Sequence, residues 1–178
     1  MNIQRIFLSI LFMLPFLLFA HEDTRIGFIE NQNQFHENVR FQAHFNNYTV
    51  FLENNRFTFL LESAEDLHAR HDIMKASKEE KEDFFVRAHA YRVNFLGANE
   101  NVAIERNSPH DFTLNYFLGS DESKWASGVR SYEKVRYINL YDGINLMAGV
   151  EEGNLKYDFV VKPGGDPNFI VLDFDLRD

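Results

Sequence analysis

Apolar and polar side chains alternate along many short stretches of this chain, and that period of two limits the fold more than any other feature. The clearest stretch is 155–161, where Leu155 and Tyr157 alternate with Lys156 and Asp158. Successive side chains of a β-strand point to opposite faces of a sheet, so the stretch predicts a strand with one buried face.

Similar stretches recur between turn residues and predict roughly ten short strands. No strand–helix–strand rhythm accompanies them, which favours an all-β fold, mainly antiparallel and sandwich-like. Phenylalanine is common, with 19 residues, and we expect an aromatic core. The predicted strands are 40–45, 48–53, 56–61, 85–96, 102–105, 112–118, 132–140, 144–150, 155–161 and 169–174.

Turn and capping residues mark the boundaries between these strands. Asn54 and Asn55 lie between two alternating stretches. Asparagine tolerates a positive φ angle, so the pair predicts a tight hairpin turn. The sequence Asn-Ser-Pro at 107–109 is predicted to break the chain between two strands. Asp121 is predicted to cap a short helical turn that ends at Trp125.

Residues 63–83 differ from the rest of the chain. They are rich in Glu, Lys, Ala and His and have almost no β-branched residues. Ser63, followed three residues later by Asp66, resembles a helix N-cap box. The segment has too few large apolar residues to fill a deep core stripe. We therefore predict one solvated helical insertion around 63–83.

Residues 1–20 have the order of a secretory signal peptide, with Arg5, an apolar run at 6–19 and Ala20 before a polar segment. The run is shorter than the roughly 20 apolar residues that span a bilayer. We predict cleavage after Ala20 and export to the periplasm, the cell surface or the medium. An uncleaved membrane anchor is the alternative, because Leu18 is not the small residue usual at its position.

Charge and cysteine content exclude several classes of partner and site. The net charge of −9 argues against nucleic acid and against anionic membranes, which both need clustered Lys and Arg. The chain has no cysteine, which excludes a lipoprotein anchor and a thiolate metal site. Residues 21–178 suit a single β domain. Because the chain ends close to the stretch 169–174, we expect that domain to be truncated at its C-terminal end.

The best metal-ligating pattern lies in the predicted helical insertion, at Asp66, His68, His71 and Asp72. Residues three or four apart share one face of a helix, so His68 would converge with His71 and Asp72. Imidazole and carboxylate ligands suit zinc or another divalent ion. The alternative is a solvated polar face with no metal.

Trp125, Tyr116, Tyr132 and Tyr137 are candidate ligand-binding aromatics, since exposed rings stack on sugars. The alternative for the single tryptophan is packing into the core. Nothing local groups a nucleophile with a base, and the Gly-x-Ser-x-Gly elbow of serine hydrolases is missing. We predict no catalytic residues and no cofactor.

Seven short motifs occur in a fixed order along most of the chain. They are FIEN at 28–31, HAYRVNFLGAN at 89–99, NYFLG at 115–119, SKWAS at 123–127, VRY at 135–137, LYDGI at 140–144 and LKYDFVVKPG at 155–164. Together they resemble the uncharacterised N-terminal β domain of large secreted Bacteroidota proteins. Those proteins carry SBBP-type β-propeller repeats and the C-terminal sorting domains of type IX secretion and gliding motility.

The resemblance implies a non-catalytic module of an exported cell-surface or secreted protein, with a structural or adhesive role. Its partners would be other domains of a longer surface protein or components of the cell envelope, with a glycan as a further candidate. No membrane span would remain after cleavage of the leader. The alternatives are a carbohydrate-binding module that uses exposed aromatics and an exported hydrolase whose site the sequence does not reveal.

Overall fold

The computed structural model describes residues 27–73 and 84–177, and in this part of the chain ten strands form one sheet beside a single α-helix. In chain order the elements are β1 (Phe28–Glu30), β2 (Phe41–His44), β3 (Tyr48–Leu52), β4 (Arg56–Glu62), α1 (Ala64–Ile73), β5 (Ala88–Leu96), β6 (Ala103–Tyr116), η1 (Glu122–Lys124), β7 (Ala126–Tyr141), β8 (Ile144–Glu151), β9 (Asn154–Val161), η2 (Pro167–Phe169) and β10 (Val171–Arg177).

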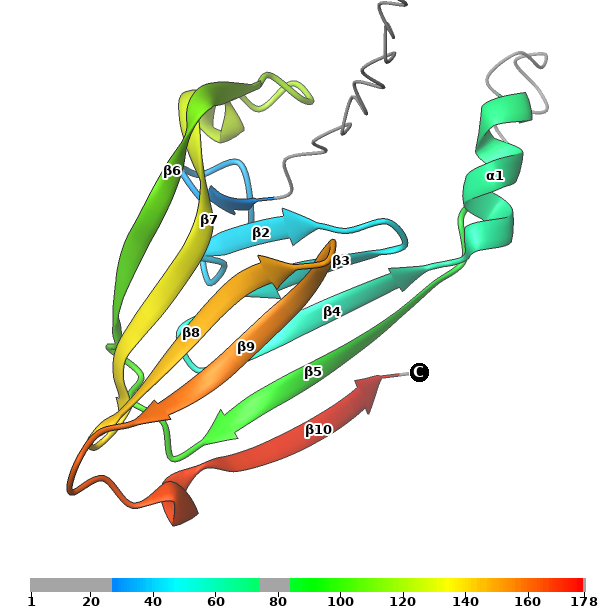
Figure 1. Ribbon diagram of the computed structural model, residues 1–178. Helices are drawn as coiled ribbons and strands as arrows, with labels where there is room; N and C mark the ends of the chain where they lie inside the picture. Colours follow the sequence, from blue (N-terminus) through cyan, green and yellow to red (C-terminus); the bar gives the residue numbers. More distant parts are fainter. Residues whose placement is uncertain (1–26, 74–83, 178) are drawn as a thin grey trace, which may run out of the picture.

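The sheet runs in the order β10-β5-β4-β3-β2-β1-β7-β8-β9, and β6 pairs with β7 beside this path. Every pairing is antiparallel. The predicted fold class, mainly antiparallel β with one helical insertion, is therefore confirmed. In Figure 1 the strands β8 and β9 pass in front of β3 and β4, and the ring of Phe57 on β4 lies against that of Tyr157 on β9, so two parts of one curled sheet face each other.

The long strand β7 makes the sheet curl. One edge of β7 first pairs with β1 at Ser131 and Tyr132 and then pairs with β8 from Lys134 onward. Its other edge pairs with β6 along most of its length. Because two strands share one edge of β7 in succession, the sheet has to change direction there, which brings its two parts together as two layers.

An aromatic core fills the space between the layers, as the alternating stretches predict. Phe57 of β4 is fully buried, with its ring centroid 5.0 Å from that of Phe95, 5.6 Å from that of Tyr157 and 6.0 Å from that of Tyr137. Burying such a ring contributes about 1.5–3 kcal/mol. The hydroxyl of Tyr137 donates to the Glu53 carbonyl oxygen at 2.9 Å, and burial raises the pKa of Tyr137.

The predicted break at 107–109 is wrong, because β6 runs through it. Ser108 has a φ of 53°, and the register to β7 shifts between Pro109 and Thr113. These features form a bulge rather than a strand end. Within the described residues β6 pairs on one side only. An N–H on the open side of such a strand has no ladder partner, so a proline is tolerated there.

The predicted hairpin at Asn54 and Asn55 is confirmed, but its backbone differs from the prediction. Leu52 of β3 pairs with Phe57 of β4, and the Glu53 N–H donates to the Arg56 carbonyl oxygen at 3.0 Å. Neither asparagine has a positive φ angle. Instead the Asn54 side chain donates to the Glu100 carbonyl oxygen at 2.8 Å, so its role is to attach the turn to a neighbouring loop.

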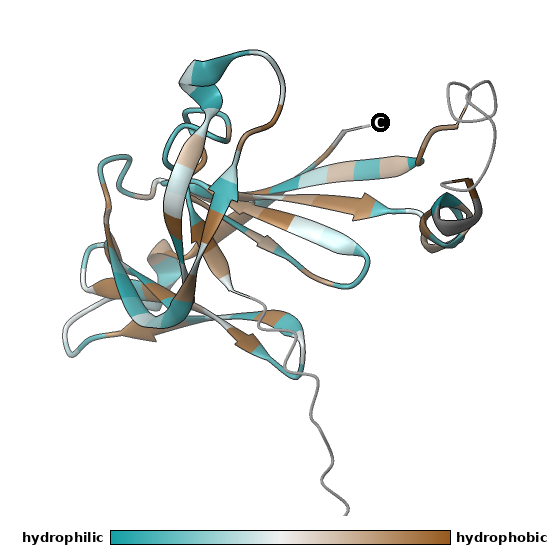
Figure 2. Cartoon of the chain, turned by 90° about the horizontal axis from the view of Figure 1, so that it is seen from above, coloured by the Kyte–Doolittle hydropathy of each residue, from teal (hydrophilic) through white to brown (hydrophobic). Residues whose placement is uncertain are grey.

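Several predicted boundaries shift by a few residues. Phe85 lies before β5 and Phe169 lies in η2, outside the strands predicted for them. The predicted short turn is confirmed as η1, whose Asp121 side chain accepts from the Ser123 N–H. In Figure 2 hydrophobic residues, in brown, recur along the strands, while α1 stands apart from the sheet.

Two predictions fall on residues outside the described part of the chain. The proposed leader at 1–20 lies there entirely, and so does 74–83 of the helical insertion. Within the described ranges, no helix is both long enough and apolar enough to cross a membrane.

Candidate functional site

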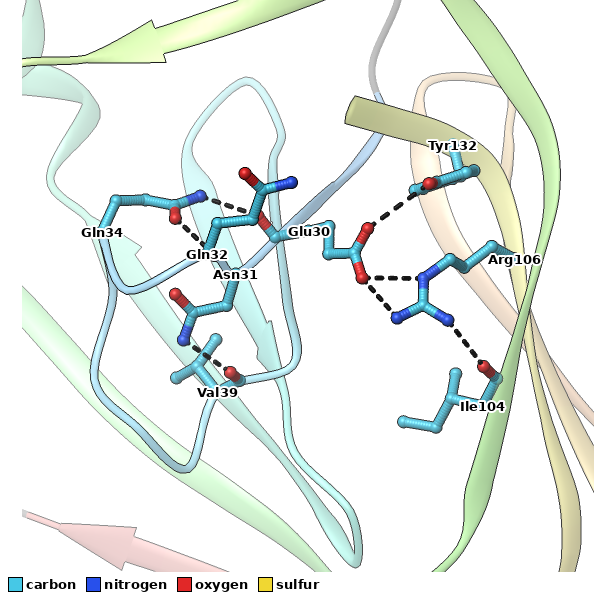
Figure 3. Close-up of polar contacts among 8 residues, drawn as sticks. All are labelled: Glu30, Asn31, Gln32, Gln34, Val39, Ile104, Arg106 and Tyr132. Carbon is cyan, nitrogen blue, oxygen red and sulfur yellow. Dashed lines mark hydrogen bonds and ion pairs between the residues drawn. The ribbon is translucent and has the colours of Figure 1, made fainter. Parts of the chain in front are cut away.

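A tight loop after β1 is organised by one side chain. In residues 31–39, here called the Asn31 loop, the Asn31 amide donates to the carbonyl oxygens of His36 at 2.9 Å and Val39 at 2.8 Å. Its oxygen accepts from the N–H groups of Asn33 at 3.0 Å and Phe35 at 3.1 Å. Because one amide satisfies four backbone groups, the loop has a defined shape. Figure 3 shows the bond to Val39.

An ion pair attaches the start of this loop to the β6–β7 layer. The Arg106 Nε donates to Glu30 at 2.8 Å, and the Tyr132 hydroxyl lies 3.4 Å from the same carboxylate (Figure 3). Arg106 also lies over the Phe41 ring, 5.8 Å from its centroid. Burial, and then the charge of Glu30, raise the pKa of Tyr132. The Asn31 loop is therefore held against both parts of the sheet.

The Asn31 loop forms one wall of a pocket of about 340 Å³ on the outer face of β3, β4 and β5. We call it the loop pocket. Phe51, Thr58 and Arg92 are paired across the three strands and give the pocket its floor. It is lined by Phe35, His36, Asn38, Val39, Phe51, Glu53, Arg56, Thr58 and Arg92.

The charged groups of the loop pocket are unequally satisfied. Glu53 is nearly buried and accepts from the Arg56 guanidinium at 2.8 Å and from the Thr58 hydroxyl at 3.0 Å. The guanidinium of Arg92 takes part in none of the side-chain hydrogen bonds or ion pairs between described residues. The Asn38 N–H donates to His36 Nδ1 at 3.3 Å, so a neutral His36 carries its proton on Nε2.

A second pocket, of about 340 Å³, lies between the two layers of the sheet, near β9 and β10, which are the last and first strands of the sheet order. We call it the open end. Its wall on β10 is Phe174, which is 59% exposed although it pairs with the buried Val93 on the core-facing side. Leu176, two residues further along the same face, is 68% exposed. The open end is lined by Tyr48, Phe59, Leu61, Tyr91, Val93, Leu155, Tyr157 and Phe174.

The four predicted ligand-binding aromatics do not form one platform. Tyr132 and Tyr137 are buried, because both belong to the aromatic core, and as ligand contacts they are wrong. Tyr116 is half-buried, and its ring centroid lies 5.7 Å from that of Phe35. Trp125 remains, 40% exposed rather than packed in the core.

Trp125 does have an exposed aromatic neighbour that the sequence reading missed. Its ring centroid lies 5.8 Å from that of Phe117, which is 59% exposed, and its Nε1 donates to the Gly119 carbonyl oxygen at 3.3 Å. Because η1 brings Trp125 back toward the end of β6, the two rings form a small exposed cluster.

The predicted metal ligands are only partly described. Asp66 is not free to bind a metal, since its carboxylate accepts from the Arg87 N–H at 2.9 Å and from the Arg87 guanidinium at 2.8 Å. His68 is exposed. The side chains of His71 and Asp72 lie outside the described part, so the four-residue site stays a prediction. Elsewhere in that part, no group of three His, Asp or Glu side chains could hold a metal.

Asp66 and Ser63 form half of the predicted N-cap box. The Ser63 hydroxyl accepts from the Asp66 N–H at 3.3 Å, as the motif requires. The Ser63 N–H donates instead to the Arg87 carbonyl oxygen at 2.9 Å, and the carboxylate of Asp66 is used by Arg87. The start of α1 is therefore hydrogen-bonded to Arg87, in the segment before β5, in place of the second bond of an N-cap box.

This arrangement predicts an unusual titration of Asp66. Hydrogen bonds from the Arg87 side chain and N–H hold the pKa of Asp66 well below its ordinary value. Because the pKa of Asp66 is lower in the folded protein than in the unfolded chain, the Asp66–Arg87 pair stabilises the fold at pH values above the ordinary pKa of about 3.9. This stabilisation is lost only as the pH falls further. Carboxyl NMR should show Asp66 ionised at pH 4. In an Arg87→Gln variant its pKa should return toward the ordinary value, and an unchanged titration would contradict the assignment.

A serine–histidine contact bears on the alternative that the protein is a hydrolase. The Ser131 hydroxyl and His110 Nδ1 lie 3.2 Å apart, but Ser131 is only 2% exposed. Gly27 covers the pair so closely that a Cβ atom there would clash with both side chains. A substrate carbonyl needs that space to reach the hydroxyl, so the contact fits a packing role rather than nucleophilic catalysis.

The sequence reading missed every polar group of the loop pocket. Two motifs touched this region, FIEN with Asn31 and HAYRVNFLGAN with Arg92, but neither assigned a role to these residues. Glu53 follows β3, Arg56 begins β4 and Arg92 lies in β5, so only the strand register brings them together.

Comparisons with known proteins give a single finding. The model of a family described as "Domain of unknown function (DUF7948)" matches residues 28–178. No curated protein and no solved structure matches the chain.

Proposed function

The chain belongs to this family of domains of unknown function, and from that premise we propose that it is a non-catalytic structural or adhesive module of an exported protein. Its partner is a neighbouring β-rich domain of a longer surface protein or a component of the cell envelope. The predicted leader supports export, and a mature N-terminus at His21 is the corresponding expectation. The order of the seven motifs supports an origin in a Bacteroidota surface protein with type IX secretion.

The observation that carries the proposal is the open end. Phe174 and Leu176 are more than half exposed on a strand face that is otherwise core. Among the described residues β10 also pairs with β5 alone, so its other edge has no strand partner. Exposed apolar surface and unpaired strand edges favour association with another β-structure. A domain that docks there would extend the sheet and cover the rings.

We expect the open end to be covered when the protein is in its native setting. The chain has no cysteine, so a Leu176→Cys variant carries one reactive thiol at this surface. In the native host, maleimide labelling of that thiol should be about tenfold slower or more than in the purified 178-residue chain, because only the undocked fraction reacts.

Glu133→Cys is the matched control. Glu133 is exposed on β7, away from the open end, and its labelling rate should be the same in both settings. Equal rates for Leu176→Cys in both settings would rule out docking at the open end. Slower labelling of both variants would show a general barrier to the reagent, and docking would again lack support.

The carbohydrate-binding alternative is favoured by one observation, the exposed pair Trp125 and Phe117. Aromatic rings of this kind stack on the apolar faces of sugars. Because Trp125 is the single tryptophan, its fluorescence reports any such contact directly. A saturable change in that fluorescence with a soluble oligosaccharide, absent in Phe117→Ala, would favour this alternative over a purely structural role.

A further inference from the structure

The loop pocket offers hydrogen-bond donors that nothing in the described structure satisfies. Its acceptor Glu53 already receives bonds from Arg56 and Thr58. The Arg92 guanidinium makes no side-chain hydrogen bond or ion pair with another described residue, and a guanidinium carries five donors and no acceptor. His36 adds a free Nε2–H when neutral, since Nδ1 accepts from Asn38. These two side chains therefore have donors to offer to a ligand that carries an acceptor.

The charge of the lining has the opposite sign to that of the protein. Glu53, Arg56 and Arg92 together leave one net positive charge in the loop pocket, whereas the chain carries −9. Asp175 of β10 lies opposite Arg92 in the register, but it has an interaction of its own and is not part of the pocket lining. A local positive charge beside an apolar wall favours an anion over a cation or a neutral group.

The remaining walls are apolar and preformed. Phe35, Val39 and Phe51 supply them, and the Asn31 side chain holds the loop that carries the first two. A volume of about 340 Å³ lies at the small end of the range for ligand pockets, roughly 300–1,000 Å³. An occupant would need a compact apolar or aromatic body and one anionic end.

We propose that the loop pocket binds a small organic carboxylate with an aromatic or apolar body, with its carboxylate on Arg92. The body packs between Phe35 and Phe51, and His36 Nε2 donates a further hydrogen bond. The site lies on the outer face of the sheet, so this proposal goes beyond docking at the open end and does not depend on it.

Phenylacetate tests the proposal, with phenylacetamide as its neutral analogue. Both are titrated into the ¹⁵N-labelled chain while amide NMR shifts are followed. Phenylacetate should give saturable shifts in the Asn31 loop and around Thr58 and Arg92. Phenylacetamide should bind about tenfold more weakly or worse, because a charged hydrogen bond is lost.

Variants locate the effect. Arg92→Gln should weaken phenylacetate about tenfold, and Arg92→Lys should retain part of the affinity because it keeps the charge without the planar fork. Arg136→Gln is the matched control. Arg136 pairs with Glu105, its Nε donating at 3.0 Å on the β6–β7 layer, and its loss should leave binding unchanged.

Three results would overturn the proposal. They are the lack of saturable shifts at the loop pocket, equal binding of phenylacetate and phenylacetamide, and equal losses in Arg92→Gln and Arg136→Gln. Native-like amide spectra of both variants show that a loss of binding does not come from unfolding.

Discussion

Replacing Phe57 by alanine is expected to lower the free energy of unfolding by about 3–5 kcal/mol, the range for large aromatic truncations in cores. Phe57 is 0% exposed. Its ring contacts Phe95 on the neighbouring strand and Tyr137 and Tyr157 on the opposite layer. The cavity would therefore lie where the two layers of the curled sheet meet, and rings held by paired strands on both sides have little freedom to fill it.

Urea unfolding followed by Trp125 fluorescence or by circular dichroism measures this effect. Phe85→Ala is the matched control, since Phe85 is 74% exposed and lies outside the strands. Its substitution should change the free energy of unfolding by no more than about 0.5 kcal/mol. Similar losses for both variants would mean that the layers do not pack on Phe57 as described.

Replacing Asn31 by alanine is expected to cost roughly 2–6 kcal/mol, because it removes four hydrogen bonds that each contribute about 0.5–1.5 kcal/mol. The loss has a local part as well. Without the amide, the Asn31 loop no longer has a defined shape, and the wall that Phe35 and Val39 give to the loop pocket is lost. Urea unfolding gives the stability, and phenylacetate titration gives the state of the pocket.

One further variant separates the donor role of Asn31 from its acceptor role, and a second variant is the control. Asn31→Asp keeps the acceptor for the Asn33 and Phe35 N–H groups but places a carboxylate against two carbonyl oxygens, so it should destabilise as well. Gln32→Ala is the control, because Gln32 is exposed and only its backbone N–H is used, donating to Gln34 at 2.6 Å. An Asn31→Ala variant with an unchanged free energy of unfolding would show that the loop is held by other contacts.

Local pattern was enough to predict most of the strands. The stretch at 155–161 and the hairpin around Asn54 and Asn55 occur nearly where the alternation indicates. The helix start at Ser63 and the η1 cap at Asp121 also follow from single side chains that bond to nearby backbone groups. These features depend on residues a few positions apart, which a sequence displays directly.

The failures have one cause in common. The proline at 109 predicts a break, yet β6 continues because this strand pairs with β7 alone among the described residues. Tyr132 and Tyr137 appear as candidate ligand contacts, yet the turn of β7 between the layers places both in the core. Whether a strand is an edge, and which face is inside, depends on its neighbours in the sheet.

The candidate site also combines residues that a local motif marks with contacts that only the fold creates. Glu30 and Asn31 lie within a recognisable motif, but the partner of Glu30 is Arg106, 76 residues away in sequence. The loop pocket needs Arg92 to pair with Thr58 across the β4–β5 register, two residues along β4 from Arg56. The open end exists only because the sheet path terminates at β9 and β10.

By itself the sequence determined that this chain is built from antiparallel strands around aromatic rings, because side-chain alternation and turn chemistry act over two to four neighbouring residues. The tertiary structure alone decided which rings are buried, which guanidinium groups line the loop pocket and where apolar surface remains open. Those properties depend on strand order and register, which bring together residues that no local rule relates.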